Sequence, residues 1–374
     1  IAMTDQPRVL ASMAMLELRG PLHIGEVGIG REETLSYVPS DTLFSALVSA
    51  WAAREPGEAQ RELGEWLSDF LTDPPNPPFR LTSAFPWAGG VRFYPRPLGL
   101  QGWSEPKKTK RIRWVSEGIF QSLVTGQQLT AEQKQTNLLH DGTVWVLGEE
   151  RDAIARALKL SANQEVHLWW EDVAPRVTVD RLANRSNLFH TGRAGYASGG
   201  GLWFAVRFRD DAARALWRPR IQEALATLAD MGLGGLRSQG HGGFHFKWEE
   251  EAEVPAGDLR SGYMVTLARY VPRDAAEIER TLRPSGTSYS LVRVGGWCMD
   301  DAYHAWRRKP LRLVAEGSLL GHDGGAPGRL VDVTPEPEAE PRPIFHNGRR
   351  VYRYGLAFPV AVDKRALRPP EERA

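Results

Sequence analysis

The sequence has a single cysteine, Cys298, in 374 residues. One cysteine forms neither an internal disulfide nor a cysteine-based zinc site, which excludes a disulfide framework and favours a reducing compartment, the cytoplasm. The chain also lacks any run of 18 apolar residues, and no basic segment followed by an apolar stretch stands at its start. We therefore expect neither a membrane-spanning segment nor a secretion signal.

The chain also has almost no net charge: 47 basic and 46 acidic side chains give +1. A value this small at first argues against a nucleic-acid partner. The distribution of that charge is uneven. Residues 92–113 carry seven basic and one acidic residue (+6), 176–193 carry four and one (+3), and 237–247 carry two and none (+2), which leaves −10 for the rest. Three basic segments on an acidic chain indicate a localised polyanion site, and three unrelated solvated faces are the alternative.

The composition is that of a globular protein, with 42% hydrophobic residues and 13 tryptophans. A single core tends to stop growing near about 250 to 300 residues, so a chain of this length is expected to form two domains. We place the first domain at residues 10–250 and the second at 255–365.

The first domain repeats a strand–helix pattern. A strand at 13–18 precedes a helix that begins with Ser40 and Asp41 as capping residues, and a second unit has a strand at 202–208, a helix that stops at Gly232 and a strand at 244–248. Prolines and glycines interrupt regular structure from residue 73 onward. This order predicts a ferredoxin-like (RRM-like) α+β sandwich with an antiparallel sheet and a large basic insertion at about 73–150.

An acidic link at 249–258 is expected to lead into the second α+β domain. There we expect a helix at 275–282 and strands at 263–270, 288–294, 311–315 and 352–361.

The most specific local signal is a glycine-rich segment at 232–243, six glycines in twelve residues between a helix and a strand. Glycine lets backbone N–H groups approach a phosphate, and arginine and serine side chains add donors. A P-loop is disfavoured because its motif is absent and the glycines follow a helix; a tight structural turn is the alternative. The candidate binding residues are Gly234, Gly235, Arg237, Ser238, Gly240, His241 and Gly242.

The second signal is the basic stretch 176–193. Its arginines and amides suit phosphate and 2′-hydroxyl oxygens, and its aromatic rings suit stacking on an unpaired base, whereas an extended strand with solvated arginines is the alternative. The candidates are Arg176, Arg181, Asn184, Arg185, Ser186, Asn187, Phe189 and His190.

The third signal is a cluster of cations beside Trp103 and Trp114 on an expected hairpin or loop. Phosphate tracking with base stacking is the functional interpretation, and a solvated hairpin tip is the alternative. The candidates are Lys107, Lys108, Lys110, Arg111 and Arg113.

Support for catalysis is weaker. His241 and His245 are four residues apart in a glycine-rich segment, and no third metal ligand is evident, so we expect no metal site and no cofactor. A metal-independent ribonuclease would need a general base near a 2′-hydroxyl group, for which His23 and His190 are the candidates. We expect a binding protein and not an enzyme.

Several segments together resemble a known family. The sequences LHIG at 22–25 and YVPSDTLFSAL at 37–47 are similar to the opening of the fourth Csm subunit of type III-A CRISPR effector complexes, and GGLRSQGHGGF at 234–244 is similar to the signature of the wider repeat-associated RNA-binding (RAMP) superfamily. The segments 290–297, 315–318 and 351–358 resemble the C-terminal half of the same subunit.

This resemblance implies two ferredoxin-like domains that hold the repeat-derived 5′ handle of a guide RNA (crRNA) without cutting it. It also implies contacts with the large polymerase-like subunit and with a backbone RAMP subunit, and it adds His23 and Ser40 to the RNA-binding candidates. One departure is His241-Gly242-Gly243 where a basic residue commonly ends the loop, which puts that phosphate contact in doubt. The alternatives are a guide-processing endoribonuclease on the same fold, a protein-only scaffold whose basic strips bind acidic neighbours, and the equivalent type III-B subunit.

Overall fold

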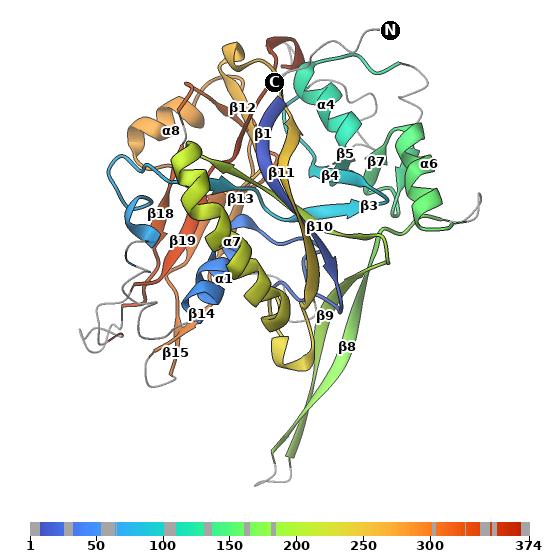
Figure 1. Ribbon diagram of the computed structural model, residues 1–374, viewed down its shortest axis with the longest axis vertical. Coiled ribbons are helices and arrows are strands. Elements are labelled where there is room, and N and C mark those ends of the chain that lie inside the picture. Colours follow the sequence, from blue (N-terminus) through green and yellow to red (C-terminus); the bar gives the residue numbers. More distant parts are fainter. Residues whose placement is uncertain are drawn as a thin grey trace.

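The computed structural model describes residues 8–25, 33–53, 64, 66–100, 110–130, 137–160, 165–180, 185–300, 304–325, 327–336, 345 and 350–367. The chain folds as a mixed α+β protein with antiparallel sheets (Figure 1). The fold class predicted from the sequence is confirmed. No helix in these described ranges is long and apolar enough to cross a membrane.

The N-terminal half is built on a ferredoxin-like sheet. Its framework runs β1 (Arg8–Leu18), α1 (Ser40–Ala52), β3 (Phe85–Ala88), β10 (Gly200–Phe208), α7 (Asp211–Met231) and β11 (Phe244–Pro255), with β2 (Phe79–Leu81) paired to β10. The strand order β11-β1-β10-β3 with antiparallel pairing is that of a βαββαβ sandwich. Helices α1 and α7 pack against each other on one face of this sheet (Figure 1).

Helix α7 forms where the 3.6-residue periodicity predicts it. The Asp210 side chain accepts a hydrogen bond from the Ala213 amide, which caps the N-terminus, and Ile221, Leu225 and Leu228 are buried on one face. The helix ends before Gly232, whose φ of +85° breaks the helical backbone. The helix stop thus places the glycine-rich segment directly at the end of α7.

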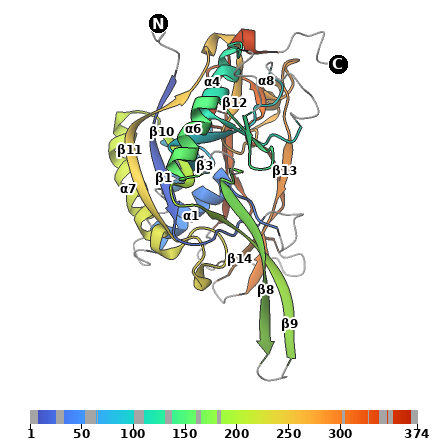
Figure 2. The same cartoon turned by 90° about the vertical axis from the view of Figure 1, so that its right-hand side faces the viewer.

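The insertion between β3 and β10 has two parts. The first part continues the sheet through β4 (Val91–Pro95), β5 (Trp114–Ser116), β7 (Val144–Val146) and β6 (Asn137–Leu139), accompanied by α4 (Glu117–Thr125) and α6 (Gly148–Ala157). The second part is a ribbon of two long strands, β8 (Trp169–Asp180) and β9 (Arg185–Tyr196), which projects from the body in both views (Figure 2). The basic stretch 176–193 therefore lies on two paired strands and not on one extended strand.

The C-terminal half has a smaller sheet of the same type. Strand β12 (Tyr263–Thr266) lies between β17 (Leu319–Gly321) and β20 (Pro359–Ala361), and Ser288 bridges to Leu319 on the far side of β17. One helix, α8 (Ala275–Thr281), follows β12, whereas a hairpin of β18 (Gly328–Asp332) and β19 (Tyr352–Leu356) stands where a βαββαβ fold has its second helix. The remaining elements are β13 (Leu291–Val294), β14 (Trp297–Met299), β15 (Ala305–Arg307), β16 (Leu311–Val314) and the 3₁₀ turns η1 (Arg237–Gln239), η2 (Leu259–Ser261) and η3 (Lys364–Ala366).

A buried charge cluster joins the two halves. Asp41, at the start of α1, lies 2.8 Å from Arg353 Nη1 and 3.5 Å from Arg269 Nη1, and the Arg269 Nε lies 3.5 Å from the Glu316 carboxylate. The hydrophobic core is likewise continuous across the halves, since residues such as Leu43 and Phe358 belong to one cluster. The division into domains at about residues 250–255 stays a prediction.

Two local predictions were wrong. The acidic residues from 249 to 255 continue strand β11 and are not a link, because their backbone pairs with β1. Ser40 and Asp41 do not cap helix α1, whose N-cap is Pro39 without a side-chain hydrogen bond. Instead the Ser40 hydroxyl accepts a hydrogen bond from the Arg269 amide at 2.9 Å, and both side chains are buried between the halves.

Candidate nucleic-acid interface

The base of the glycine-rich segment is tightly packed. A Cβ atom at Gly242, where φ is +76°, would overlap the carbonyl oxygen of Leu233, and one at Gly234 would lie 2.5 Å from the His23 carbonyl oxygen. Backbone hydrogen bonds join Leu233 to Gly242 and Gly242 to Pro21. The glycines at the base therefore serve the fold of the loop, as the structural alternative supposes.

The tip of the loop is different, because residues 237–240 are exposed. Leu236 has a left-handed backbone with φ +57° and leads into the turn η1. The amides of Arg237 and Ser238 have no hydrogen-bond partner among the described residues, as is usual for the first residues of such a turn. Adjacent free amides beside an arginine and a serine are donors of the kind that bind anions.

His23 joins the loop to the ribbon. Its carbonyl oxygen accepts a hydrogen bond from the Gly235 amide at 2.8 Å, and its ring Nδ1 lies 2.6 Å from the carbonyl oxygen of Gly192 in β9. Because a carbonyl oxygen only accepts, Nδ1 donates this hydrogen bond. The neighbouring residue Leu22 pairs with Ala194 of the ribbon through two backbone hydrogen bonds. Three segments distant in sequence thus meet at His23.

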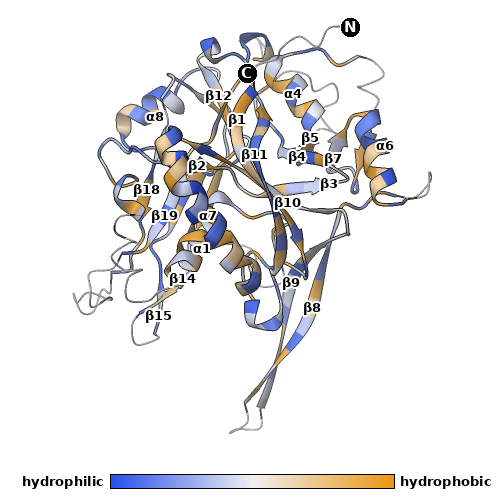
Figure 3. Ribbon diagram, in the orientation of Figure 1, coloured by the Kyte–Doolittle hydropathy of each residue, from blue (hydrophilic) through white to orange (hydrophobic). Residues whose placement is uncertain are grey.

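The ribbon has two chemically distinct faces, because side chains alternate along each strand. The strand register places Arg176 opposite Phe189, which puts Arg176, Asn187, Phe189 and Arg193 on one side, the arginine face. The other side, the apolar face, carries exposed Val173, Val177, Val179 and Leu188, together with Ser186 and His190. Polar and apolar residues accordingly alternate along β8 in Figure 3. Two candidates, Ser186 and His190, thus lie on the face away from Arg176.

The arginine face lies against the glycine-rich loop at a loop–ribbon junction formed by His23, Arg176, Arg193 and His241. Burial lowers the pKa of His241, and the positive charges of Arg176, His23 and Arg193 lower it further, although a contact with the Gln239 carbonyl opposes this. The His241 Nε2 and the Nε atoms of both arginines are buried without a hydrogen-bond partner among the described residues. Buried polar atoms of this kind are normally satisfied, so the junction is short of one or more partners.

On its other side the loop borders a pocket of about 470 Å³, the central pocket, lined by α1, the loop and the C-terminal half. Four arginines line it. Asp41 pairs with Arg269 and Arg353 and neutralises part of their charge, which leaves Arg237 and Arg308 to make the pocket cationic. Burial lowers the pKa of Arg308 to about 10, helped by the charge of Arg353, so the guanidinium is still protonated at neutral pH.

The third basic strip does not join this site. Strand β5, which follows Arg113, is separated from β1 by β10, β3 and β4 in the sheet, four strand spacings or roughly 19 Å at about 4.8 Å each. Lys110, Arg111 and Arg113 are exposed there. The expectation that all three strips converge is therefore wrong for this one, and an RNA contact by these residues stays a separate prediction.

Several candidates fall elsewhere. Lys107, Lys108, Arg181 and Asn184 lie outside the described residues, as does the side chain of Arg185. Ser40 is fully buried and Gly242 is buried with its amide bonded to Pro21, so neither offers a surface to RNA. Sequence reasoning missed Arg308. Its signal was present, because residues 293–312 hold five basic and two acidic residues, the same +3 as residues 176–193.

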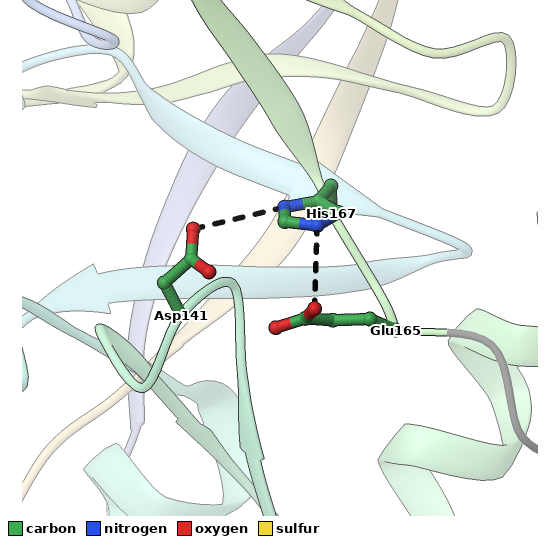
Figure 4. Close-up of side chains that lie close together, drawn as sticks. All are labelled: Asp141, Glu165 and His167. Carbon is green, nitrogen blue, oxygen red and sulfur yellow. Dashed lines mark ion pairs between the residues drawn. The ribbon is translucent and has the colours of Figure 1, made fainter.

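A cluster of possible metal ligands lies away from this site, on the insertion (Figure 4). The exposed His167 ring has its Nδ1 3.8 Å from Asp141 and its Nε2 3.8 Å from Glu165. Each carboxylate thus faces a different ring nitrogen, which suits an exposed ion-pair network. One metal ion would need a ring nitrogen and both carboxylates on the same side.

The described residues thus form a ferredoxin-like sheet with a glycine-rich loop between its last helix and last strand, followed by a second α+β half. This fold is shared with solved structures of CRISPR subunits.

Comparisons with known proteins show which families the chain is similar to. Residues 260–362 match the family described as CRISPR Csm4 C-terminal domain. The "CRISPR system Cms protein Csm4" of Thermococcus onnurineus is 26% identical over 335 residues, covering 87% of this chain and 91% of that protein; the Streptococcus thermophilus protein of that name is 24% identical over 300 residues, covering 79% and 84%.

The fold agrees with solved structures. The "Csm3-Csm4 subcomplex in the type III-A CRISPR-Cas interference complex" is similar with a TM-score of 0.64 and 15% identity, covering 96% of this chain and 100% of the other. A "Csm1-Csm4 cassette in complex with cA4" has a TM-score of 0.53 and 18% identity, covering 95% and 98%. Together these likenesses show that the chain is similar to Csm4 proteins along most of its length and shares their fold.

Proposed function

We propose that this chain is a cytoplasmic, non-catalytic subunit of a type III-A CRISPR effector complex that binds the 5′ handle of the guide RNA. The observation that carries the proposal is the meeting of the loop tip, His23 and the arginine face of the ribbon at one cationic site. The RNA backbone would cross the loop tip, with the ribbon on one side and the central pocket on the other.

The loop tip supplies phosphate contacts. The free backbone amides of Arg237 and Ser238 would donate to a phosphate oxygen, as the amides at a helix N-terminus do. The exposed Arg237 side chain would add a charge-assisted hydrogen bond. These contacts are independent of base identity, as contacts to a nucleic-acid backbone are.

The loop–ribbon junction supplies a further backbone contact. The His241 Nε2 and Arg176 Nε atoms are themselves shielded from solvent, so they are not the contacting atoms. Arg176 as a whole is half-buried, and the terminal nitrogens of its guanidinium would donate to a phosphate or sugar oxygen.

The solved relatives suggest the protein partners. One is described in a subcomplex with Csm3 and another in a cassette with Csm1. We propose that this chain likewise contacts a backbone RAMP subunit and the large polymerase-like subunit, and so links them at the guide's 5′ end.

Replacing Arg237 with Glu tests the site. We expect the purified full chain to bind a fluorescent single-stranded RNA carrying the guide repeat, and the variant to bind roughly 10- to 100-fold more weakly because it loses one charge-assisted contact and gains repulsion. The slope of log affinity against log salt should fall by about 1. Arg283→Glu, which alters a 72% exposed arginine beyond α8, is the matched control and should change neither quantity. Equal affinity for both variants would exclude the loop tip from the interface.

A guide-processing endoribonuclease is the second candidate, because the His23 Nδ1 is held by the Gly192 carbonyl, which leaves Nε2 as the ring nitrogen that could serve as a general base. Incubation of the full chain with repeat RNA in EDTA separates the two functions. Intact RNA supports binding alone, whereas 2′,3′-cyclic phosphate ends that disappear in a His23→Gln variant would establish cleavage.

A further inference from the structure

A second surface of aromatic and basic residues lies in the C-terminal half, on the hairpin formed by β13–β14 and β15–β16. Trp297 keeps 55% of its surface exposed, and the guanidinium of its cross-strand partner Arg307 lies 5.0 Å from the ring centroid. The fold gains little from a tryptophan that stays exposed, because its apolar surface is not buried. An exposed aromatic ring held in place by an arginine is the arrangement on which unpaired bases stack.

The charges of this hairpin are also not explained by the fold. Arg293 and Arg312 stand directly opposite each other in the strand register, and both are exposed. Like charges in opposed positions destabilise a strand pair, and no carboxylate in the described ranges pairs with either arginine. A bound polyanion would turn this repulsion into attraction.

The hairpin is rigidly anchored where it bends. The Arg353 Nη2 donates to the Gly295 carbonyl at 2.7 Å, and Arg353 is itself held by the buried Asp41. The Arg308 amide donates to Gly296, and its Nε donates to the Trp297 carbonyl at 3.0 Å. These bonds fix Trp297 relative to the cluster between the two halves, so a ligand would find the ring already in position.

This surface is continuous with the site at the glycine-rich loop. A cavity of about 870 Å³ beside Trp297 is lined by Arg293, Arg307, Lys309 and others, and it shares Gly295, Gly296 and Arg308 with the central pocket. Within the lining of that cavity only Glu336 is acidic, and it pairs with Lys309 on the exposed surface. The hairpin and the ribbon both extend toward the end of the molecule away from the two termini (Figures 1 and 2).

We infer that the Trp297 surface, formed by Arg293, Trp297, Arg307, Arg308, Lys309 and Arg312, is a second RNA subsite that stacks one unpaired base of the same guide strand. The inference rests on the proposed function, since the strand would reach this surface from the loop tip through the central pocket. Trp297 stacks the base while the arginines hold the flanking phosphates. Binding here is selective for single-stranded RNA because a base in a duplex has no free face.

The test compares three variants of the full chain on one fluorescent single-stranded RNA of about 16 nucleotides, the upper end of site sizes for stacking surfaces. Trp297→Ala should weaken binding roughly 5- to 150-fold, the range expected when a stacked base loses its aromatic partner. Trp297→Phe should recover much of this loss because it keeps an aromatic face. Arg283→Glu is the control for an exposed charge far from both sites.

The outcomes distinguish this inference from the proposed function. If wild type binds, Arg237→Glu loses binding and Trp297→Ala does not, then the subsite is overturned while the loop site stands. If wild type does not bind RNA at all, both are overturned. If Trp297→Ala leaves RNA affinity unchanged but prevents assembly with the protein subunits, the surface binds a protein and not RNA, and the inference is wrong. Photocrosslinks from RNA to the Trp297 peptide, lost on competition with unlabelled RNA, support it.

Discussion

Asp41 shows how one residue can hold the two halves of the molecule together. Its carboxylate is 1% exposed and faces two buried arginines from the C-terminal half, while Glu316 faces Arg269 from the other side. Three of these residues, Asp41, Glu316 and Arg353, come from the segments 37–47, 315–318 and 351–358, which carry the resemblance to the family. The residue types in those segments are therefore explained by the buried charge cluster, independently of any RNA contact.

Removal of this carboxylate is predicted to be costly. Asp41→Ala leaves Arg269 and Arg353 buried with uncompensated charge, so we expect the free energy of unfolding to fall by about 3–5 kcal/mol in urea titrations followed by circular dichroism. The control is Glu253→Ala, which breaks an exposed pair with Arg8 and should cost less than about 1 kcal/mol. A comparably small effect of both substitutions would mean that the cluster does not lock the halves.

Residue type alone did not reveal this role. Serine and aspartate before an apolar helical stripe are usual capping residues, and the same two residues are equally suited to a buried hydrogen bond and ion pair. Only the positions of Arg269 and Arg353, more than 200 residues away in sequence, decide between the two uses. Long-range partners of this kind leave no local signal.

At the scale of elements, the periodicity of the sequence predicted helices α1, α7 and α8 correctly, because each pattern is contained within a few turns. It also predicted strands β1, β10, β11, β12, β13, β16 and β19. The β8–β9 ribbon was not predicted. Its pairing joins residues on either side of a turn, and the alternation that separates Arg176 from Val177 has meaning only once the register is known.

The two faces of the ribbon provide an internally controlled experiment. Arg176→Ala should weaken RNA binding roughly tenfold and lower the salt slope by about 0.7, the value for one phosphate contact on a single strand. Val177→Thr changes the next residue, which points to the apolar face, and should leave the affinity for isolated RNA within about twofold. If Val177→Thr weakened binding as much as Arg176→Ala, the RNA would not be confined to the arginine face. Both affinities are measured by fluorescence anisotropy over a range of salt concentrations.

For the whole molecule, charge along the sequence predicted the presence of a polyanion site but not its extent. Two of the three basic strips meet at His23, whereas Lys110, Arg111 and Arg113 lie several strands away. Strand order in a sheet is set by the entire topology, so the charge of a segment gives no information on its neighbours. The segment 293–312 around Trp297 carries the same net charge, +3, as residues 176–193 and lies on the other side of the central pocket.

We propose that guide RNA runs from the arginine face of the ribbon, over the loop tip and through the central pocket to Trp297. A map of RNA–protein crosslinks on this chain within the assembled effector complex tests it most directly. We predict crosslinked peptides containing Arg176, Arg237 and Trp297, with none from the strip at Lys110 to Arg113. Crosslinks confined to that strip, or to the top of the molecule near the chain termini, would contradict the claim.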